Sequence, residues 1–183
     1  MSSKKDRLYL NLALNLAKNM EGLTGTNPSV GSVLVKNDEI ISLASTGYNG
    51  TPHSEFSLLN KIDKKITTGS SLYVTLEPCS HYGKTPPCTN IIINKKISKL
   101  VFGAHDIDER SSKRAKQILK SKKIMVKNIN VPKINEFYKP YIFQRKYKQP
   151  YVVGKIACSK DFFIKNLKSK YISNTYTQSF SHH

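Results

Sequence analysis

The chain has 183 residues, 38% of them hydrophobic, and a formal net charge of +18, a size that suits one domain plus a fragment and excludes two full domains. No run of about 18 apolar residues is present, and the N-terminus lacks the apolar stretch of a signal peptide, so we expect no membrane span and a cytoplasmic protein. The lysines are scattered along the chain, which predicts a solvated basic surface and no nucleic-acid partner.

The hydrophobic pattern predicts alternating helices and strands. Leu8, Leu12, Leu16 and Met20 recur at helical spacing and predict a first amphipathic helix with these four side chains on one stripe. Two β-rich runs at 32–35 and 40–43 flank a polar turn, which predicts a hairpin. The remaining expected elements are a helix over 54–62 entered through Pro52, a strand at 72–75, a helix from Cys88, a strand at 99–102, a helix at 112–122, a strand at 124–126 and a helix at 131–147.

Strands that alternate with helices predict an α/β fold, in which helices cover both faces of a sheet. Ligand sites in such folds lie where the loop after a strand meets a helix N-terminus. His53 is expected at the start of one helix, Cys79 just after a strand, and Cys88 at the start of another helix. We therefore expect these three side chains to converge on one point.

One imidazole and two thiolates are the donor set of a zinc ion, and a catalytic zinc site keeps its fourth position open for a water molecule. Glu55 lies two residues from His53 and is free to move protons. His81 as a fourth ligand would instead make a closed structural site and leave Glu55 without a role. The three cysteines form a poor disulfide framework. Cys158 lies in a strand-like run and is predicted to pack in the core.

The segment Thr75-Leu-Glu-Pro-Cys-Ser-His-Tyr-Gly-Lys-Thr-Pro-Pro-Cys88, with Asn27-Pro-Ser-Val-Gly31 and His53-Ser-Glu55, closely resembles the deaminase domain of the bifunctional riboflavin biosynthesis protein RibD. The most specific feature is the eight residues between the two cysteines, where most cytidine-deaminase-like enzymes have two. The resemblance implies a three-layer α/β/α sandwich with a mixed central sheet. It also implies one Zn²⁺ per chain, held by His53, Cys79 and Cys88, with Glu55 as the proton shuttle.

The resemblance further implies a substrate. The enzyme would convert 2,5-diamino-6-(5-phosphoribosylamino)pyrimidin-4(3H)-one to 5-amino-6-(5-phosphoribosylamino)uracil and ammonia. The expected substrate contacts are His81, Lys84 and Thr85, which place hydrogen-bond donors beside the zinc that suit a ribose phosphate or a polar pyrimidine edge. Asn27 is expected to hydrogen-bond the ring. The chain departs from the family pattern at 44–46 and 106–109, so the phosphate and ribose contacts of those loops stay unassigned.

Three alternatives remain open from the sequence. Deoxycytidylate deaminases share a likeness to Gly47-Tyr-Asn-Gly-Thr-Pro52, and the basic charge would suit a tRNA adenosine deaminase. Both classes normally lack the eight-residue insertion between the cysteines. A catalytically inactive, zinc-stabilised remnant is the third alternative, and the presence of Glu55 argues against it.

Residues 148–183 resemble the start of the RibD reductase domain, after a deaminase domain at 1–147. The run 150–159 predicts a strand, and Ala157 and Ser169 match family positions near the nicotinamide cofactor. One strand cannot build a dinucleotide-binding sheet, so we expect NADPH binding only with a complete reductase domain and no reductase activity from this chain. A homo-oligomer or a separate reductase chain is an open expectation.

Overall fold

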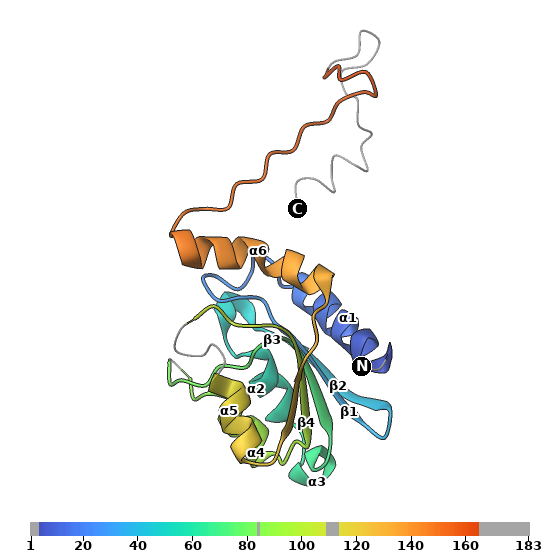
Figure 1. Cartoon of the computed structure of the whole chain (residues 1–183), viewed down its shortest axis with the longest axis vertical. Coiled ribbons are helices and arrows are strands. Elements are labelled where there is room, and N and C mark those ends of the chain that lie inside the picture. Colours follow the sequence, from blue (N-terminus) through green and yellow to red (C-terminus); the bar gives the residue numbers. More distant parts are fainter. Residues whose placement is uncertain (1–3, 84, 109–113, 165–183) are drawn as a thin grey trace. The chain divides into compact units, whose positions relative to one another are not determined.

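The computed structural model of the chain describes residues 4–83, 85–108 and 114–164. It contains two compact units, Met1–Pro150 and Tyr151–His183 (Figure 1). Every helix and strand found in the described residues belongs to the first unit. None of the helices in these ranges combines the length and the apolar character needed to cross a membrane.

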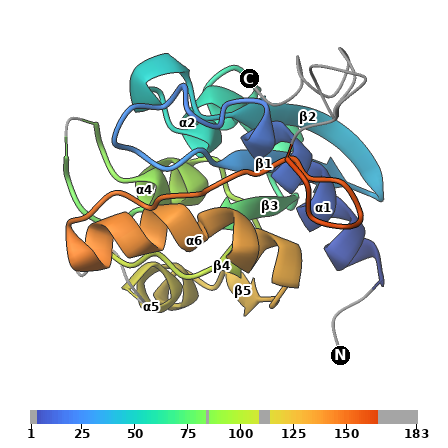
Figure 2. The same cartoon turned by 90° about the horizontal axis from the view of Figure 1, so that it is seen from above.

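A mixed five-stranded sheet forms the centre of the first unit (Figure 2). Its strands are β1 (Gly31–Lys36), β2 (Glu39–Ser45), β3 (Ser71–Leu76), β4 (Lys99–Ala104) and β5 (Met125–Asn128), arranged in the order β2-β1-β3-β4-β5. Strand β1 pairs antiparallel with β2 and β3, whereas β3, β4 and β5 are parallel. The carboxyl ends of β3 and β4 therefore meet at the same edge of the sheet.

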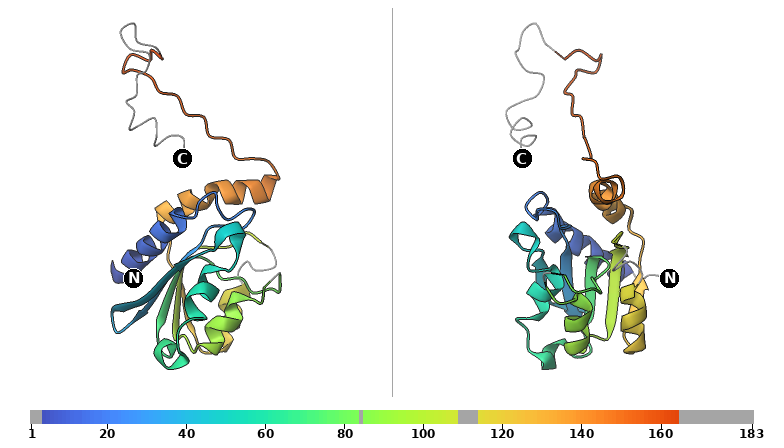
Figure 3. Two further views of the ribbon diagram at one scale, coloured as in Figure 1. Left: turned by 180° about the vertical axis from the view of Figure 1, so that it is seen from behind. Right: turned by 90° about the vertical axis from the view of Figure 1, so that its left-hand side faces the viewer.

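Helices cover both faces of this sheet (Figure 3). On one face lie α1 (Lys4–Lys18) and α6 (Pro132–Tyr147), and on the other lie α2 (Ser54–Leu59), α4 (Cys88–Asn94) and α5 (Arg114–Ser121). The two faces are marked by neighbouring residues of β1, because Gly31 packs against α1 while Oγ of Ser32 lies 2.6 Å from Oγ of Ser54 in α2. The predicted three-layer α/β/α sandwich with a mixed sheet is confirmed.

The hairpin predicted from the runs at 32–35 and 40–43 is also confirmed. Lys36 pairs with Glu39, and the two residues between them, Asn37 and Asp38, both have positive φ, of 51° and 65°. Two central residues in the left-handed region define the tight turn whose twist matches a β-hairpin, and Asn and Asp tolerate that conformation.

The predicted first amphipathic helix is confirmed as α1, but the stripe of Leu8, Leu12, Leu16 and Met20 is not its buried face. Leu8 is 63% exposed, and Leu12, Leu16 and Met20 are only partly buried. The buried face of α1 consists of Asp6, Tyr9, Leu10, Ala13, Leu14 and Ala17. Apolar residues occupy most positions from 8 to 17, so spacing alone does not choose the face. The buried face is set by small residues at the contact between α1 and β1. The backbones of Ala13 and Gly31 pack directly together there, since a Cβ on Gly31 would lie 1.9 Å from the carbonyl oxygen of Ala13.

Two short helices were not expected from the sequence. They are α3 (Lys64–Thr67) and the 3₁₀ helix η1 (Tyr48–Gly50). Helix α3 begins after Asp63, whose Oδ1 accepts a 2.6 Å hydrogen bond from the backbone N–H of Lys65. The predicted helix over 54–62 ends at Leu59, and this cap explains why a second short helix begins at Lys64.

The strand predicted at 150–159 is absent from the described residues of the second unit, which carry a turn at 160–161 and a bend at 164. Cys158 is exposed, so its predicted core packing is wrong. The reason is that residues 151–164 contain no neighbouring strand to pair with this run. Ala157 is also exposed, and Ser169 lies outside the described residues. The reductase-like character of 148–183 remains a prediction.

Candidate metal centre and active site

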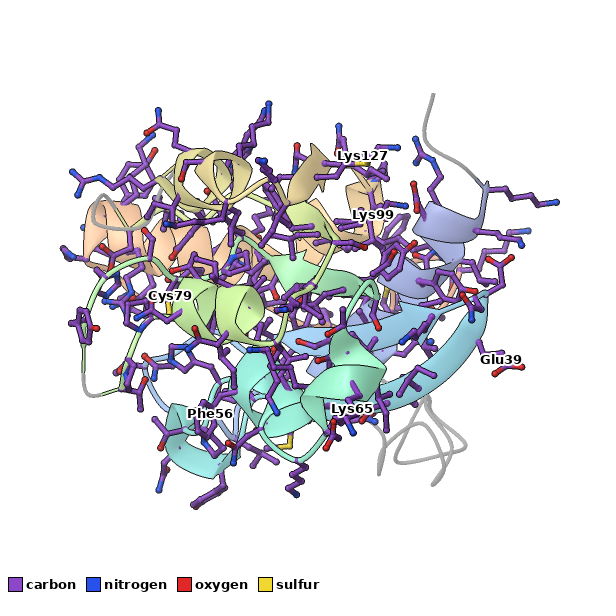
Figure 4. All side chains as sticks on the ribbon, turned by 90° about the horizontal axis from the view of Figure 1, so that it is seen from below. Glu39, Phe56, Lys65, Cys79, Lys99 and Lys127 are labelled. Carbon is purple, nitrogen blue, oxygen red and sulfur yellow. The ribbon has the colours of Figure 1, made fainter. Side chains whose placement is uncertain are left out.

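Three elements bring the predicted ligands together. His53 is the N-cap residue of α2, Cys79 follows β3, and Cys88 is the first residue of α4. Their ligand atoms all lie within 4.8 Å of one another. Nδ1 of His53 is 3.3 Å from Sγ of Cys88 and 3.5 Å from Sγ of Cys79. Figure 4 shows Cys79 at the end of the sheet opposite to Lys99, the first residue of β4.

The spacing of these atoms fits a zinc ion. Zinc–sulfur bonds of about 2.3 Å and zinc–nitrogen bonds of about 2.0 Å at a tetrahedral angle place sulfur and nitrogen about 3.5 Å apart. The two observed nitrogen–sulfur distances are 3.3 and 3.5 Å. His81 is not a member of the metal-binding group found in the described residues. Three protein ligands are the number that a catalytic zinc site uses.

The hydrogen bond between the two thiols shifts their pKa values in opposite directions. The Cys88 side chain hydrogen-bonds to Cys79 and lowers the pKa of Cys79 to about 4, against the opposing effect of burial. The same hydrogen bond, together with burial, raises the pKa of Cys88. His53 has a raised pKa, chiefly because of its hydrogen bond to Cys79. The hydrogen bond thus favours the thiolate form of Cys79 and the thiol form of Cys88, and metal binding requires Cys88 to lose its proton.

Glu55 lies in the first turn of α2 and is 4% exposed. Oγ of Ser54 donates a 3.1 Å hydrogen bond to its Oε2, which fixes the rotation of the carboxyl group. Burial is the main cause that raises the pKa of Glu55, and the Cys79 thiolate adds to it. A raised pKa makes the carboxylate a stronger base that binds a proton more readily, which suits a general acid–base.

A cavity of about 540 Å³ opens above these residues. It is lined by His53, Glu55 and Cys79, together with three of the four predicted substrate contacts, Asn27, His81 and Thr85. The fourth, Lys84, lies outside the described residues. The volume falls within the range of small-molecule sites. The structure thus gathers the predicted residues, and their substrate contacts remain a proposal.

Asn27 reaches the cavity because the loop beside it contains a glycine. Its Nδ2 donates to the carbonyl oxygen of Gly50 at 3.1 Å. Gly50 has φ of +84°, and a Cβ there would lie 2.6 Å from Cβ of Asn27 and 2.6 Å from Thr24 O. Only glycine allows both the positive φ and this close approach. The 47–51 loop therefore fixes Asn27 at the wall of the cavity.

Several polar residues of the cavity were missed by the sequence reasoning. Asp106 and Asp108 follow β4, while Tyr141 and Arg145 come from α6, and all four line the cavity. Oδ1 of Asp106 accepts from Tyr141 Oη at 3.3 Å and from the backbone N–H of Asp108 at 3.1 Å. Burial raises the pKa of Asp106. Its position directly after a strand parallel to β3 was a usable signal. No sequence signal indicated Tyr141 or Arg145.

A pair between the exposed His105 and the buried Glu77 joins the segments that follow β3 and β4. Nδ1 of His105 lies 2.7 Å from Oε2 of Glu77, whose side chain is completely buried. The other carboxylate oxygen, Oε1, is buried without a hydrogen-bond partner in the described residues. The backbone N–H of Glu77 donates to Ala104 O at 2.8 Å. These contacts hold the loop that carries Cys79 against the loop that carries Asp106.

Comparisons with known proteins point to one group of enzymes. The family model of the cytidine and deoxycytidylate deaminase zinc-binding region matches residues 3–104. A diaminohydroxyphosphoribosylamino-pyrimidine deaminase from Buchnera aphidicola subsp. Schizaphis graminum is 37% identical, over 77% of this chain and 95% of that protein.

Two longer relatives carry the name RibD. The riboflavin biosynthesis protein RibD of Aquifex aeolicus is 36% identical, over 97% of this chain and 50% of its own length. A structure of RibD from Acinetobacter baumannii superposes with a TM-score of 0.81 at 31% identity, over 98% of this chain and 51% of that chain. This chain therefore spans about half the length of the RibD relatives that it matches.

Proposed function

Because this chain belongs to the cytidine and deoxycytidylate deaminase family, and within it to the diaminohydroxyphosphoribosylaminopyrimidine deaminases, we propose that it is a zinc-dependent hydrolytic deaminase of riboflavin biosynthesis. The proposed substrate is 2,5-diamino-6-(5-phosphoribosylamino)pyrimidin-4(3H)-one. The oxygen of water replaces the 2-amino group of the ring, and the products are 5-amino-6-(5-phosphoribosylamino)uracil and ammonia.

Some residues of the site are proposed to bind the metal, and one is proposed to transfer protons. His53, Cys79 and Cys88 would hold zinc, which when bound lowers the pKa of a water molecule towards neutrality and so supplies the nucleophile. The carboxylate of Glu55 takes the proton of that water. It would then pass that proton to the ring nitrogen next to the reacting carbon. After the oxygen has added to this carbon, Glu55 would take the remaining proton of the new hydroxyl group and give it to the amine, so that the C–N bond breaks, ammonia leaves and the carbonyl forms. Ser54 keeps the carboxylate in one orientation through these steps.

The observation that carries this proposal is the position of Glu55. It is buried beside a three-member ligand group at the wall of a cavity. A structural zinc site takes four protein ligands and does not need a buried carboxyl with a raised pKa next to them. The arrangement therefore favours catalysis over the zinc-stabilised remnant that the sequence left open.

The two other deaminase substrates are less well supported. A deoxycytidylate or tRNA adenosine deaminase would use the same ligands and the same proton shuttle. The near full-length relative from Buchnera is named for the diaminopyrimidine substrate. The eight residues between Cys79 and Cys88 also fit that substrate class better than the two-residue spacing of most cytidine-deaminase-like enzymes.

One experiment separates the three substrates. The zinc-loaded protein is incubated with the diaminopyrimidine ribotide, with deoxycytidylate and with an adenosine-containing tRNA loop, and ammonia release is measured. We expect release from the ribotide alone. Release from deoxycytidylate alone, or from the tRNA loop alone, would refute the proposed substrate while leaving the deaminase chemistry intact.

Several expectations from the sequence extend this proposal. They are a cytoplasmic location, a homo-oligomer or a separate reductase partner, and NADPH binding only with a complete reductase domain. Ammonia release measured alongside NADPH oxidation would test the last of these. Oxidation that depends on the deaminated product would contradict it.

A further inference from the structure

The charges that line the cavity are unevenly distributed. Four carboxyl groups lie there, from Glu55, Glu77, Asp106 and Asp108. Among the described residues of the lining, Arg145 is the only arginine or lysine. A phosphate monoester carries a charge of about −1.5 to −2 at neutral pH. The carboxyl groups repel such a group, so a phosphorylated ligand needs a cation at the point where its phosphate lies.

Arg145 is held in place by contacts on two sides. Its Nη2 donates to the carbonyl oxygen of Thr26 at 3.1 Å. Its guanidinium carbon lies 5.6 Å from the ring centre of Tyr141, which is one helical turn earlier on α6. Tyr141 is itself fixed by its hydrogen bond to Asp106. A guanidinium that is stacked and hydrogen-bonded in advance loses little conformational freedom when it binds an anion.

The guanidinium also has donors that the protein does not use. Nε is buried and has no hydrogen-bond partner among the described residues, and the bond to Thr26 is the only hydrogen bond of this side chain there. An unpaired buried N–H costs free energy, which an acceptor oxygen from a ligand recovers. Arginine binds phosphate through two parallel N–H donors. Donor geometry and charge thus point to the same kind of ligand.

We propose that Arg145 binds the phosphate group of the substrate and selects phosphorylated over unphosphorylated aminopyrimidine ribosides. This inference rests on the proposed function. In the described residues Arg145 contacts none of the three metal-binding side chains and is linked to the cavity floor through Tyr141 and Asp106. It therefore acts on substrate binding and leaves the chemical step unchanged.

The first test compares Arg145→Gln with Lys146→Gln, which removes the same charge from the next residue of α6. Lys146 is exposed, contacts the ring of Tyr147 and does not line the cavity. Ammonia release is measured with the ribotide and with the corresponding riboside. We expect Arg145→Gln to raise KM for the ribotide roughly 10- to 100-fold with kcat nearly unchanged. The riboside kinetics should not change, and Lys146→Gln should resemble the wild type with both substrates.

An equal loss with ribotide and riboside would overturn the proposal, as would an unchanged KM for the ribotide. Arg145→Lys keeps the charge but not the paired donors, so an intermediate KM supports the phosphate contact. Stoichiometric zinc in each variant shows that the metal centre is intact, and a loss of activity that accompanies a loss of zinc counts against a specific role in binding.

A second test measures binding without turnover. Ribose 5-phosphate is titrated into the zinc-loaded wild type, Arg145→Gln and Lys146→Gln by calorimetry. We expect binding to the wild type and to Lys146→Gln, and at least tenfold weaker binding to Arg145→Gln. Equal affinities for all three proteins, or no binding to the wild type, would overturn the proposal. Arginine-dependent binding without ammonia release from the ribotide would instead reject the proposed function and keep the phosphate site.

Discussion

Oγ of Ser54 donates a hydrogen bond of 3.1 Å to Oε2 of Glu55, its neighbour in the first turn of α2. The same hydroxyl is paired at 2.6 Å with Ser32 in the middle of the sheet, and all three side chains are buried. The orientation of the carboxyl group is therefore set by strand β1 as well as by its own helix. A buried polar chain of this kind is stiff, since each member satisfies the next.

The first prediction concerns Glu55. Glu55→Gln should bind stoichiometric zinc and lose turnover by roughly 100- to 10,000-fold, because the amide keeps the shape of the side chain but does not shuttle protons. Metal analysis and ammonia release measure the two effects. Glu136→Gln is the matched control, since Glu136 is exposed on α6. Turnover retained in Glu55→Gln would show that another group moves the proton.

The second prediction concerns the metal ligands. Cys79→Ser and Cys88→Ser should each lose zinc, and the melting temperature should fall, because part of the metal-binding free energy is folding free energy. The chain offers Cys158→Ser as a control, because Cys158 is exposed and does not belong to the ligand group. Its zinc content and melting temperature should match the wild type. Unchanged zinc in either ligand variant would contradict the assignment.

The third prediction concerns the packing of α6 on the sheet. Oη of Tyr138 is fully buried, lies 2.6 Å from Thr75 Oγ1 and donates to Ser29 O at 2.9 Å. Tyr138→Phe should lower the free energy of unfolding by about 1–3 kcal/mol, because buried polar groups lose their partner. Urea titration measures this. Tyr147→Phe alters an exposed ring and should change little; an equal loss in both variants would refute the role of the buried hydroxyl.

The fourth prediction is a pH dependence. Burial alone would raise the pKa of Asp6, but the hydrogen bonds from Lys99 at 2.6 Å and Tyr73 at 2.8 Å outweigh it and leave this pKa below its usual value. A carboxyl with a depressed pKa in the folded protein stabilises it above the unfolded-state pKa, and that stability is lost as the pH falls through the folded-state pKa.

Asp6→Asn should therefore lower the unfolding free energy at neutral pH by about 1.5–3 kcal/mol, and the difference from the wild type should shrink as the pH falls through the lowered folded-state pKa of Asp6. Asp38→Asn breaks an exposed pair with Lys5 and serves as the control, with little change at either pH. A difference that stays constant with pH would show that the Asp6 charge is not responsible.

The metal ligands could be found in the sequence because each one combines a distinctive chemical type with a local signal. Cys79 follows strand β3, whose ends were predicted within one residue, and Cys88 begins helix α4, whose start was predicted there. Glu55 followed from its spacing to His53. These inferences needed only the nearest neighbours along the chain, where side-chain directions are set by backbone periodicity.

Residues that depend on distant parts of the chain were missed. Tyr141 and Arg145 join the cavity only because α6 packs along one face of the sheet and reaches the loops before β1 and after β4. The buried face of α1 was likewise chosen by the close approach of Ala13 to Gly31, which lies outside the helix. Cys158 was predicted to pack in a core, but it is exposed, and the described residues of its unit contain no such core.

The sequence by itself determined the α/β architecture, the three metal ligands and the carboxyl group beside them, because these follow from residue chemistry and short-range periodicity. The tertiary structure decided which polar groups face the cavity, how Glu55 is oriented and where the single described cation of the lining lies. Those features arise from packing between elements up to 119 positions apart in the chain, as in the bond from Arg145 to Thr26. Periodicity carries no information about contacts at that separation, since they are set by the shapes and volumes of the packed side chains.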